Sequence, residues 1–459
     1  NPATGERVSS LPWASEQEVD SAIALAEQGY RQWRHVSLEQ RADALRKVGN
    51  ALRARAEEMA QMISLEMGKP IAQARGEVTK SANLCDWYAE HGPAMLATEA
   101  TQVENNNAVI EYRPLGAILA IMPWNFPLFL IGRKVAPALI AGCTVVLKAS
   151  SDCPNGAYEF AKIVEKSSLP KGVINVITGS GALTGNALAS NPKISIVTIT
   201  GSTEVGKKIM KAAADNVTKV SLELGGKAPV IVMNDCKLDE TVDHVVASRV
   251  INTGQVCNAA ERVYVQEGIA EEFTKKVIEK MKTLTYGPAL AGTFDMGSMV
   301  NKAQQEHVDE MVQSAIAEGA TVACGGHKVQ VDGKGWFYEP TVITGCTHDM
   351  RIMRDEIFGP VLPITTFKTL DEAIEMANDS VYGLTSSIYT TDYDTVMRAM
   401  NEIKFGETYV NREHFEAFQG FHQGVRQSGI GGEDGELGVE EYLETHVCYV
   451  DWDTERNKA

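Results

Sequence analysis

Short apolar segments alternate with longer helical segments through most of the 459-residue chain, and this alternation limits the possible folds more than any other feature. Five predicted strands, each followed by a predicted helix, lie at residues 117–122, 144–147, 173–177, 194–199 and 219–222. Alternation at this spacing is typical of βαβ units, which form parallel sheets with ligand sites at the carboxyl ends of the strands. The sequence therefore predicts an α/β fold.

The pattern restarts after Lys227. A second group of predicted strands lies at 229–233, 262–265, 320–324 and 361–367, with a helix from Glu271 onward. A chain of this length exceeds what one hydrophobic core supports. We therefore expect two α/β domains, and we place their boundary at the glycine-containing segment 223–226 because no low-complexity linker is visible.

The first hundred residues are predicted to be mainly helical. Ser15 and Ser37 each precede a Glu or Gln by three positions, as in a capping box, and apolar residues recur behind them at three- and four-residue steps. Residues 101–112 instead alternate around three asparagines at 105–107, which predicts a β-hairpin turn. Such a hairpin is either an edge that pairs with another subunit or a solvated surface hairpin.

The acidic composition restricts the possible partners. A formal net charge of -17 argues against a nucleic acid or an anionic membrane, because the overall field repels phosphate. No run approaches the roughly 18 apolar residues of a membrane helix. The eight cysteines are dispersed without metal-ligand spacing, so we expect no metal and a reducing, cytoplasmic setting. The chain starts at Asn1 rather than at a methionine, which is compatible with a native N-terminus further upstream.

Two residues offer the clearest chemistry. Glu223 and Cys257 both lie beside glycines in segments about thirty residues apart. A cysteine can attack a carbonyl carbon, and a glutamate can remove the proton of the water that later releases the product. The pair suggests a two-step covalent mechanism, although a Glu and a Cys near glycines are common in any chain.

Two glycine-rich turns point to a nucleotide. Residues 201–208 resemble a P-loop, but Lys208 stands where a magnesium-binding Ser or Thr is required, which argues against a triphosphatase. What remains is a strand ending in Thr200 and a helix whose first amides can face a pyrophosphate. Residues 179–185 deviate by one position from GxGxxG spacing. Each turn alone is more often ordinary, and the two together favour a dinucleotide site.

Two further residues have a catalytic and a structural interpretation. Asn125 follows a predicted strand between two prolines, where its amide can donate to a developing oxyanion or can be satisfied within a rigid turn. His422 lies in a glycine-bounded loop at 419–424, and the other eight histidines are expected to be surface or structural residues. No histidine neighbours Cys257 in the sequence, and a pairing in space stays open.

Taken together, these motifs resemble the aldehyde dehydrogenase superfamily. The matching segments are PWNFP at 123–127, GSTEVG at 201–206, LELGGK at 222–227, NTGQVC at 252–257 and EIFGP at 356–360. Five segments in the family's order cover almost the whole chain, so they are more specific than any one alone. The resemblance implies an aldehyde dehydrogenase fold, with a Rossmann-like cofactor-binding domain (1–100, 115–224 and 426–445), an α/β catalytic domain (225–425) and a small β oligomerisation arm (101–114 and 446–459).

The same resemblance implies roles for individual residues. Cys257 would be the nucleophile and Glu223 the general base, Asn125 and the backbone N–H of Cys257 would form the oxyanion hole, and Lys134 would lie near the path of the catalytic water. Glu356 would hold the nicotinamide ribose and Phe358 would pack near the nicotinamide. The other implied cofactor-binding residues are Met122, Pro123, Trp124, Lys148, Ser151, Gly181, Gly185, Thr200, Gly201, Ser202, Val205 and Leu224.

One departure from the family bears on the cofactor. NAD-preferring members usually have a glutamate where this chain has Ser151, and that glutamate holds the adenosine ribose hydroxyls. A serine removes a carboxylate that would repel a 2′-phosphate. We therefore expect NAD or NADP, with NAD favoured. By analogy with the family we also expect a homodimer or a homotetramer.

The substrate prediction rests on a finer comparison. Roughly the first 120 residues, including 81–92, resemble bacterial succinate-semialdehyde dehydrogenases. From Phe126 onward, and plainly at 406–413 and 419–422, the chain resembles lactaldehyde and glycolaldehyde dehydrogenases. Pocket residues lie mostly in this second part, so it receives more weight. The resemblance puts these residues at the substrate pocket: Phe126, Arg133, Asn258, Glu416 and His422.

Polar groups at the pocket favour a short hydroxylated aldehyde, because an alkyl substrate would leave them unpaired. We expect NAD(P)+-dependent oxidation of lactaldehyde or glycolaldehyde to the acid, through a thiohemiacetal and a thioester on Cys257. Succinate semialdehyde is the alternative, since Arg133 matches an arginine that grips a carboxylate in some relatives. Glu416 and His422 could instead form an internal pair that only shapes the loop. A cofactor-independent cysteine hydrolase and a non-catalytic binding protein are remote alternatives.

Overall fold

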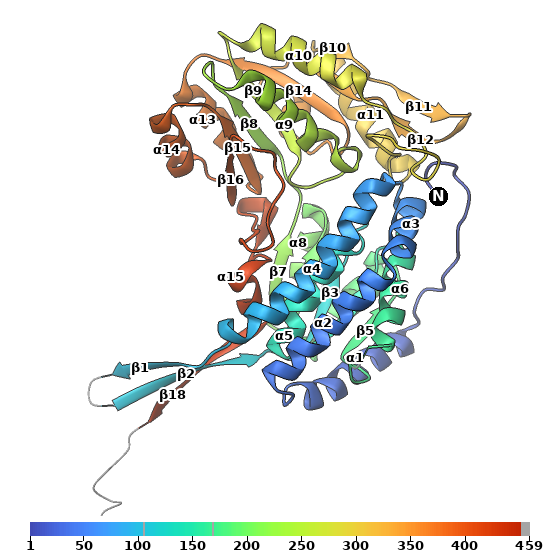
Figure 1. Cartoon of the computed structure of the whole chain (residues 1–459), viewed down its shortest axis with the longest axis vertical. Helices are drawn as coiled ribbons and strands as arrows, with labels where there is room; N and C mark the ends of the chain where they lie inside the picture. The colour runs from blue at the N-terminus through green and yellow to red at the C-terminus, as the bar shows by residue number, and fades with distance from the viewer. Residues whose placement is uncertain (104–105, 168, 451–459) are drawn as a thin grey trace, which may run out of the picture.

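The computed structural model describes residues 1–103, 106–167 and 169–450, and its elements follow the predicted alternation (Figure 1). Both predicted capping boxes are present, at Ser15 and Ser37, and such caps contribute about 1 kcal/mol each to helix stability. The predicted helical start of the chain is therefore correct. Its four helices are α1 (Glu16–Trp33), α2 (Leu38–Ala54), α3 (Ala56–Met67) and α4 (Ile71–Met95).

A six-stranded sheet has the strand order β17-β7-β6-β3-β4-β5 and is parallel except for β17, which runs antiparallel to β7. Its strands are β3 (Ala117–Ile121), β4 (Thr144–Lys148), β5 (Ile174–Ile177), β6 (Ile196–Thr200), β7 (Lys219–Glu223) and β17 (Gly429–Ile430). The associated helices are α5 (Phe129–Ala141), α6 (Pro154–Glu165), α7 (Asn186–Ala189) and α8 (Thr203–Ala214). Helices α2, α4 and α5 share one core with this sheet, and α1 and α8 share another. All five predicted strands are present here.

A seven-stranded sheet has the order β10-β13-β14-β9-β8-β15-β16, and β10 is its antiparallel edge. Its strands are β8 (Ala228–Val232), β9 (Ala260–Gln266), β10 (Thr321–Cys324), β13 (Thr341–Thr344), β14 (Val361–Phe367), β15 (Thr385–Tyr389) and β16 (Glu407–Val410). The helices of this half are α9 (Leu238–Val250), α10 (Ala270–Thr283), α11 (Lys302–Ala317), α12 (Arg351–Arg354), α13 (Leu370–Asn378) and α14 (Tyr393–Glu402). A small hairpin is formed by β11 (Lys328–Val331) and β12 (Lys334–Tyr338). The sequence predicted four of these seven strands and missed β13, β15 and β16.

Two glycines carry the chain from β7 of the first sheet to β8 of the second. A Cβ atom on Gly226 would lie 2.3 Å from the carbonyl oxygen of Cys257, and one on Gly225 would lie 2.6 Å from Oε2 of Glu356. A side chain at either position would therefore displace the backbone or carboxylate beside it. The predicted boundary at these glycines coincides with the step between sheets, and the domain limits themselves remain a prediction.

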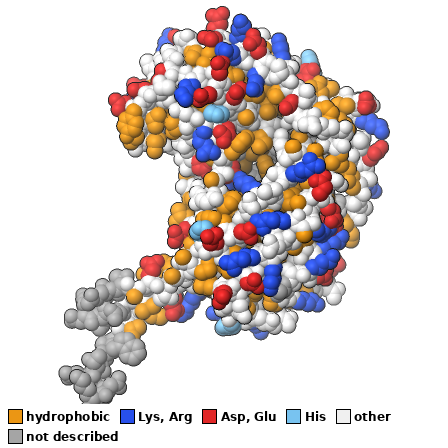
Figure 2. Space-filling view, viewed as in Figure 1, with side chains coloured by type: hydrophobic (Ala, Val, Ile, Leu, Met, Phe, Trp, Pro, Cys, Tyr) orange, Lys and Arg blue, Asp and Glu red, His pale blue; other side chains and the backbone are white. Residues whose placement is uncertain are grey.

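Three strands leave the body as an arm (Figure 1). They are β1 (Glu99–Val103), β2 (Asn106–Pro114) and β18 (Leu443–Val450), all antiparallel. The predicted hairpin is present, but residues 106 and 107 begin β2 rather than forming the turn, and residue 105 lies outside the described residues. Figure 2 shows hydrophobic side chains where the arm leaves the body, and Val447 and Tyr449 are exposed on β18.

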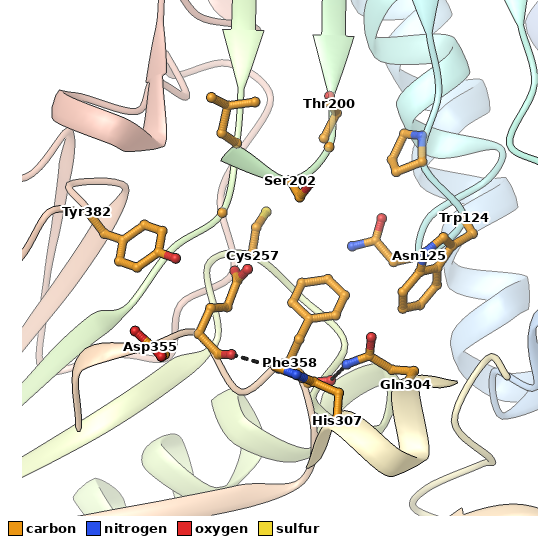
Figure 3. A pocket seen from close by; sticks show the side chains of 15 residues that line it. Trp124, Asn125, Thr200, Ser202, Cys257, Gln304, His307, Asp355, Phe358 and Tyr382 are labelled. Carbon is orange, nitrogen blue, oxygen red and sulfur yellow. Dashed lines mark hydrogen bonds between the residues drawn. The ribbon is translucent and has the colours of Figure 1, made fainter. Parts of the chain in front are cut away.

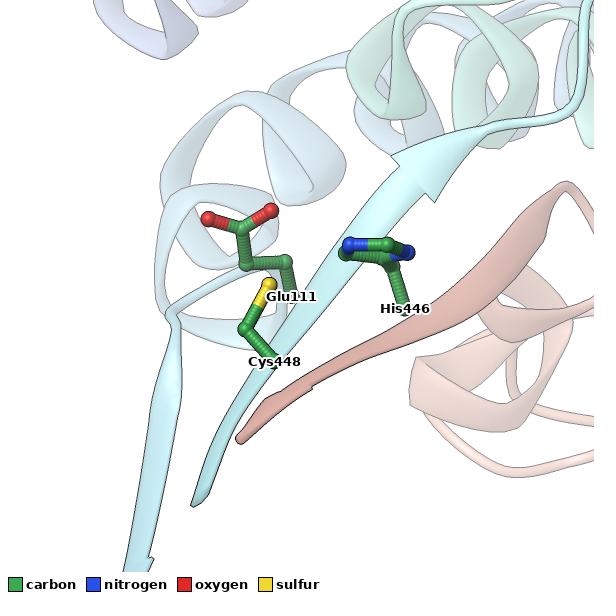
Figure 4. Close-up of side chains that lie close together, drawn as sticks. All are labelled: Glu111, His446 and Cys448. Carbon is green, nitrogen blue, oxygen red and sulfur yellow. The ribbon is translucent and has the colours of Figure 1, made fainter. Parts of the chain in front are cut away.

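Glu111, His446 and Cys448 gather on one face of the arm (Figure 4), with ligand-type atoms within 4.8 Å of one another. The register explains this grouping, because Glu111 is directly opposite His446 and Cys448 is two residues further along the same strand. Glu111 Oε2 accepts hydrogen bonds from Nε and an Nη atom of Arg113, at 3.2 and 2.7 Å. The Glu111 carboxylate is thus already neutralised by Arg113.

Within the described part of the chain, no helix is long and apolar enough to cross a membrane.

Candidate active site

The strand ends of the first sheet bring predicted site residues to one edge. Lys148, Thr200 and Glu223 are the last residues of β4, β6 and β7, and Thr200 is in register with Glu223. The backbone N–H of Met122 donates to the carbonyl of Lys148 at 3.0 Å, which brings the segment after β3 to the same edge. A doubly wound sheet presents ligand-binding residues at this edge.

Cys257 follows a tight turn between α9 and β9. Asn252, Thr253 and Gly254 all have positive φ, at 51°, 59° and 74°, a conformation that costs about 1 kcal/mol or more for each non-glycine residue. The Asn252 amide donates to the carbonyl of Asn125 at 3.0 Å. The strained turn is therefore tied to the segment of Asn125, and it holds Cys257, a half-buried residue, beside that segment.

Two hollows meet at Cys257 and Asn125. The first, drawn in Figure 3, brings together ten of the predicted residues, most of them from the cofactor set. These are Pro123, Trp124, Asn125, Thr200, Gly201, Ser202, Leu224, Cys257, Glu356 and Phe358. Five further lining residues had not been predicted: Gly225, Gln304, His307, Asp355 and Tyr382.

Aromatic and acidic groups shape this first hollow. The rings of Trp124 and Phe358 pack edge to face, 5.5 Å between centroids. Oε1 of Glu356 accepts a hydrogen bond from the backbone N–H of Gly226 at 2.7 Å, and burial raises the pKa of this carboxyl to about 8, reinforced by the nearby carboxylate of Glu261. An aromatic wall beside a hydrogen-bonding carboxyl suits a flat polar ring and a ribose.

The remaining predicted cofactor residues do not line this hollow. Ser202 caps α8 by accepting from the backbone N–H of Val205 at 3.4 Å, and the Val205 side chain is exposed. Ser151 is exposed and lines a separate hollow with residues of segment 7–13. Gly181 and Gly185 bound a π-helical turn that follows β5. The helix N-terminus at Ser202 offers free amides and an exposed apolar side chain, a combination that fits a pyrophosphate and an adenine.

The second hollow brings together all five predicted substrate residues and shares Asn125 and Cys257 with the first. The five are Phe126, Arg133, Asn258, Glu416 and His422. The Asn258 amide donates to Glu416 Oε2 at 2.7 Å, and Lys80 pairs with Glu416 Oε1 at 2.9 Å. Glu416 is therefore bonded to these two residues, and its pKa is lowered to about 2 because the cations of Lys80 and Arg133 outweigh the effect of burial.

Arg133 is deeply buried and paired with acidic residues. Its Nε atom donates to Oδ2 of Asp434 at 2.8 Å, and it lies 3.5 Å from Glu433 and 3.7 Å from Glu416. These three carboxylates raise the pKa of the guanidinium, so that it is permanently charged despite burial. The guanidinium of Arg133 thus lines the hollow with its positive charge already neutralised by carboxylates.

Asn125 has a donor directed toward the thiol's surroundings. Its Nδ2 atom donates to the carbonyl of Gln255 at 3.1 Å, and its Oδ1 atom accepts from the backbone N–H of Phe126 at 3.1 Å. A primary amide carries two N–H donors, so one of them is left for a ligand at the junction of the hollows. Both the structural and the oxyanion interpretations of Asn125 are compatible with this geometry.

Glu223 has an unusual environment. Both carboxylate oxygens are buried, and within the described residues neither has a hydrogen-bond partner. Burial raises the pKa of the Glu223 carboxyl to about 8, His422 opposes this rise and Glu433 reinforces it. A carboxyl that releases its proton just above neutral pH can act as a general base toward water.

Lys134 is one of the charged residues that act on the Glu223 carboxyl. Its ammonium is fully buried, forms an ion pair with Glu433 and donates to Oγ1 of Thr198 at 2.9 Å. The hydroxyl of Thr200 donates to the same Glu433 oxygen at 3.5 Å. Lys134 is not among the described residues that line either hollow, so it can act on the site through Glu433 and Glu223.

His422 is a second group at the thiol. Its backbone N–H and C=O each bond Glu433 at 2.8 Å, and its Nδ1 atom lies 2.7 Å from Oε1 of Glu407. His422 and Cys257 both line the second hollow. The fold therefore brings His422 to the same hollow as Cys257, although the two are far apart in the sequence.

The sequence profile of the aldehyde dehydrogenase family matches residues 1–448 of this chain. This chain belongs to the aldehyde dehydrogenase family. It is an NAD(P)-dependent oxidoreductase that acts on an aldehyde. The predicted recognition, fold class and enzyme class are confirmed, and the binding-protein and cysteine-hydrolase alternatives are set aside.

Several aldehyde dehydrogenases are similar over nearly the whole length. Lactaldehyde dehydrogenase of Escherichia coli (strain K12) is 48% identical over 453 residues, which cover 98% of this chain and 94% of the relative. A succinate semialdehyde dehydrogenase [NAD(P)+] of the same organism is 42% identical over 451 residues, covering 98% and 97%. The crystal structure of Escherichia coli lactaldehyde dehydrogenase superposes with a TM-score of 0.96 over 98% of this chain and 94% of that one.

Sequence reasoning missed the partners of the predicted residues in this aldehyde dehydrogenase. Glu407 bonds His422, Lys80 bonds Glu416, and Asp434 bonds Arg133. The glycine-rich segment around Glu433 and Asp434 is the one local signal that could have drawn attention to them. Glu407 lies within the segment 406–413 that the resemblance singles out, whereas Lys80 lies in a helix whose sequence gives no such signal.

Proposed function

We propose that this enzyme oxidises a short hydroxylated aldehyde, lactaldehyde or glycolaldehyde, to its carboxylic acid. The observation that carries the proposal is the state of the cations at the aldehyde hollow. Arg133 is paired with Asp434, Lys80 with Glu416, and His422 with Glu407. Among the described lining residues, each cation already has a carboxylate partner.

A substrate carboxylate would bind unfavourably in this hollow. It would have to displace an existing acidic partner or lie beside one, and like charges at short range are unfavourable in a buried site. A substrate hydroxyl can instead accept from Arg133 and donate to Glu416 without changing the charge. The resemblance to lactaldehyde dehydrogenase, at 48% identity, supports the same choice.

Succinate semialdehyde remains the second candidate substrate. A specific observation favours it: the guanidinium of Arg133 lies within the hollow, where it could bind a carboxylate if Asp434 moved. The relative that acts on succinate semialdehyde is 42% identical to this chain. The two candidates are separated below by their response to Asp434.

In the proposed mechanism, the Sγ atom of Cys257 attacks the aldehyde carbon and the carbonyl oxygen becomes an oxyanion. The second N–H of the Asn125 amide and the backbone N–H of Cys257 would stabilise this charge. A nicotinamide cofactor held by Trp124, Phe358 and Glu356 would supply the hydride acceptor for this oxidation. Glu223 then removes a proton from water, which attacks the thioester and releases the acid and the thiol.

The first hollow fits a nicotinamide dinucleotide on three counts. It has an aromatic wall at Trp124 and Phe358, a hydrogen-bonding carboxyl at Glu356 and a nearby helix N-terminus at Ser202. We propose that NAD is preferred and NADP accepted, because Ser151 leaves the adenosine end without the usual carboxylate. The relative named for NAD(P)+ supports this dual use.

We also propose a homodimer or a homotetramer assembled through the arm. Its edges and the exposed side chains of Val447 and Tyr449 offer backbone groups and apolar surface for pairing. A cytoplasmic location is supported by the eight cysteines, which are all free thiols.

The decisive experiment is a substrate panel with the purified enzyme. Lactaldehyde, glycolaldehyde and succinate semialdehyde are each supplied with NAD+ and with NADP+, and reduced cofactor is followed. We expect the highest kcat/KM for one of the two hydroxyaldehydes. A clear preference for succinate semialdehyde would refute the substrate proposal and leave the aldehyde dehydrogenase mechanism intact.

A further inference from the structure

The buried carboxylate of Glu261 holds the segment that carries Glu356 and Phe358. Its Oε2 atom accepts from the backbone N–H of Ile357 at 3.0 Å, and its Oε1 atom accepts from the backbone N–H of Phe358 at 3.1 Å. Phe358 has φ 54°, a left-handed conformation that is unfavourable for a residue other than glycine. Glu261 therefore stabilises a backbone conformation that Phe358 would not readily adopt by itself.

The carbonyl groups of the same segment are held by α11. The Gln304 amide donates to the carbonyl of Phe358 at 3.0 Å, and Nε2 of His307 lies 3.1 Å from the carbonyl oxygen of Glu356 (Figure 3). With its N–H groups on Glu261 and its carbonyl groups on α11, the segment 356–358 is fixed from both sides.

Glu261 is also the centre of a buried charge cluster. Nζ of Lys227 lies 2.8 Å from its Oε2 atom, and an Nη atom of Arg249 lies 2.7 Å from its Oε1 atom. Burial would raise the pKa of the Glu261 carboxyl, but these two cations lower it to about 2, so the group is ionised. Each oxygen thus accepts from one cation and one backbone N–H. A carboxylate offers about four acceptor positions, so Glu261 acts on the site through its neighbours rather than by touching a ligand.

Arg249 connects this cluster to the turn before Cys257. Another Nη atom of Arg249 donates to the carbonyl of Gly254 at 2.5 Å, and Gly254 is the last of the three turn residues with positive φ. A Cβ atom on Gly254 would lie 2.3 Å from the carbonyl oxygen of Gly359, so the turn packs directly on the residue that follows Phe358. The turn of the nucleophile and the segment 356–358 therefore meet at one cluster.

We propose that Glu261, together with Arg249, sets the position of the nicotinamide end of the cofactor relative to the Cys257 thiol. Glu261 fixes the segment 356–358 through two backbone N–H groups, and it fixes the turn before Cys257 through Arg249. The inference rests on the proposed roles of Glu356 and Phe358 at the nicotinamide end. Both Glu261 and Arg249 are positioning residues, and a misplacement of about 1 Å between reacting groups can reduce a rate about 100-fold.

The test compares two ligands on the full-length protein without aldehyde. NAD+ carries both ends of the dinucleotide, whereas AMP carries the adenosine end alone, and calorimetric titration measures the Kd of each. In a double variant, Glu261→Gln with Lys227→Met, the Kd for NAD+ should rise about tenfold, and the Kd for AMP should stay within about twofold. The second substitution removes one cation with the anion, so the buried cluster keeps its net charge and no extra cation is left unpaired.

A second variant, Glu261→Asp, keeps the charge but is one methylene shorter, so it cannot reach all four donors. Its Kd for NAD+ should lie between those of the wild type and the double variant, and it carries the test if the double variant does not fold. The matched control is Asp235→Asn, which removes another loop-holding carboxylate, one that accepts the backbone N–H of Thr391 at 2.9 Å. This control should keep both Kd values.

The burst rate supplies a readout of position rather than of affinity. At saturating NAD+ and aldehyde, the rate constant of the first burst of reduced cofactor should fall about tenfold or more in the double variant, because the donor and the acceptor of the hydride are no longer aligned. The Asp235→Asn control should keep the wild-type burst rate.

An unchanged Kd for NAD+ in both Glu261 variants would overturn the inference, and so would equal losses of affinity for NAD+ and AMP, which indicate a general structural defect. Failure of the proposed cofactor roles is visible separately, since Glu356→Gln and Phe358→Ala would then bind NAD+ as the wild type does. The two titrations contain no aldehyde, so a wrong substrate proposal leaves their result unchanged.

Discussion

The Oε2 atom of Glu223 lies 3.6 Å from the Nε2 atom of His422, and both side chains are almost fully buried. His422 in turn lines the aldehyde hollow together with Cys257. Only His422 has a fixed partner of its own, through Glu407. Glu223 has no hydrogen-bond partner among the described residues, so its carboxyl is free to bind a water molecule.

Glu223→Gln should separate the two halves of the reaction. The first burst of reduced cofactor should remain near one equivalent per subunit, because thiol attack and hydride loss do not need the carboxylate. Steady turnover should fall by about 100-fold or more, since general-base catalysis contributes on that order. Rapid-mixing absorbance at 340 nm measures both phases. Loss of the burst would contradict a role confined to hydrolysis.

The rate of thioester hydrolysis should rise with pH. Glu223 holds its proton up to about pH 8 and acts as a base only after losing it. We therefore expect the single-turnover hydrolysis rate to increase about tenfold per pH unit below the transition near 8 and to level off above it. Stopped-flow measurements between pH 6 and 9.5 check this, and a flat profile would exclude Glu223 as the titrating base.

The same group should make stability depend on pH. A free glutamate loses its proton near 4.5, whereas folded Glu223 keeps it to about 8, so the folded chain binds more protons between these values. Wild type should accordingly lose free energy of unfolding relative to Glu223→Gln as the pH rises through this window, by at most about 1.4 kcal/mol per unit. Urea unfolding of both proteins at pH 5 and 8.5 measures it. A difference that stays constant with pH would disprove the expectation.

Asp434→Asn should shift substrate preference toward a carboxylate. Asp434 has φ 71°, which asparagine tolerates, and the change removes the charge that neutralises Arg133. The ratio of kcat/KM for succinate semialdehyde over lactaldehyde should rise at least tenfold, since a charge-assisted hydrogen bond contributes about 1.5–3 kcal/mol. Asp86→Asn, which breaks an exposed pair with Arg53, is the control. An unchanged ratio would mean that Arg133 does not select the substrate.

Ser151→Glu should reduce the use of NADP. The introduced carboxylate would lie at the exposed position where the family's NAD-preferring members hold the ribose hydroxyls, and it would repel a 2′-phosphate. We expect kcat/KM for NADP+ to fall about tenfold or more and that for NAD+ to stay within about twofold. Ser21→Glu, an exposed change on α1, is the matched control. Equal losses with both cofactors would place Ser151 away from the adenosine ribose.

Much of the fold could be predicted because most buried strands have an apolar sequence. The predicted strands β3, β4 and β6 are apolar and buried along their whole length. Strand β15 is buried just as completely, but its sequence is TSSIY, so hydrophobicity alone does not mark it. The burial of Ser386 is compensated, because its hydroxyl donates to the carbonyl of Glu407 at 3.0 Å.

The site was predicted where chemistry is local and missed where it depends on distant pairing. Motif residues such as Cys257 and Asn125 have recognisable neighbours in the sequence. Lys80 and Glu416 are 336 positions apart, and no sequence pattern near either residue predicts their contact. The charge state of the aldehyde hollow therefore became visible only when the two ends of the chain were brought together.

The two hollows share Asn125 and Cys257, and their other lining residues are all different. A molecule bound in one hollow, away from these two residues, therefore leaves the other hollow open. A compound lodged against Arg133 and Glu416 would block turnover without competing with the dinucleotide for space. Raising the dinucleotide concentration would not relieve such a block, whereas raising the aldehyde concentration would.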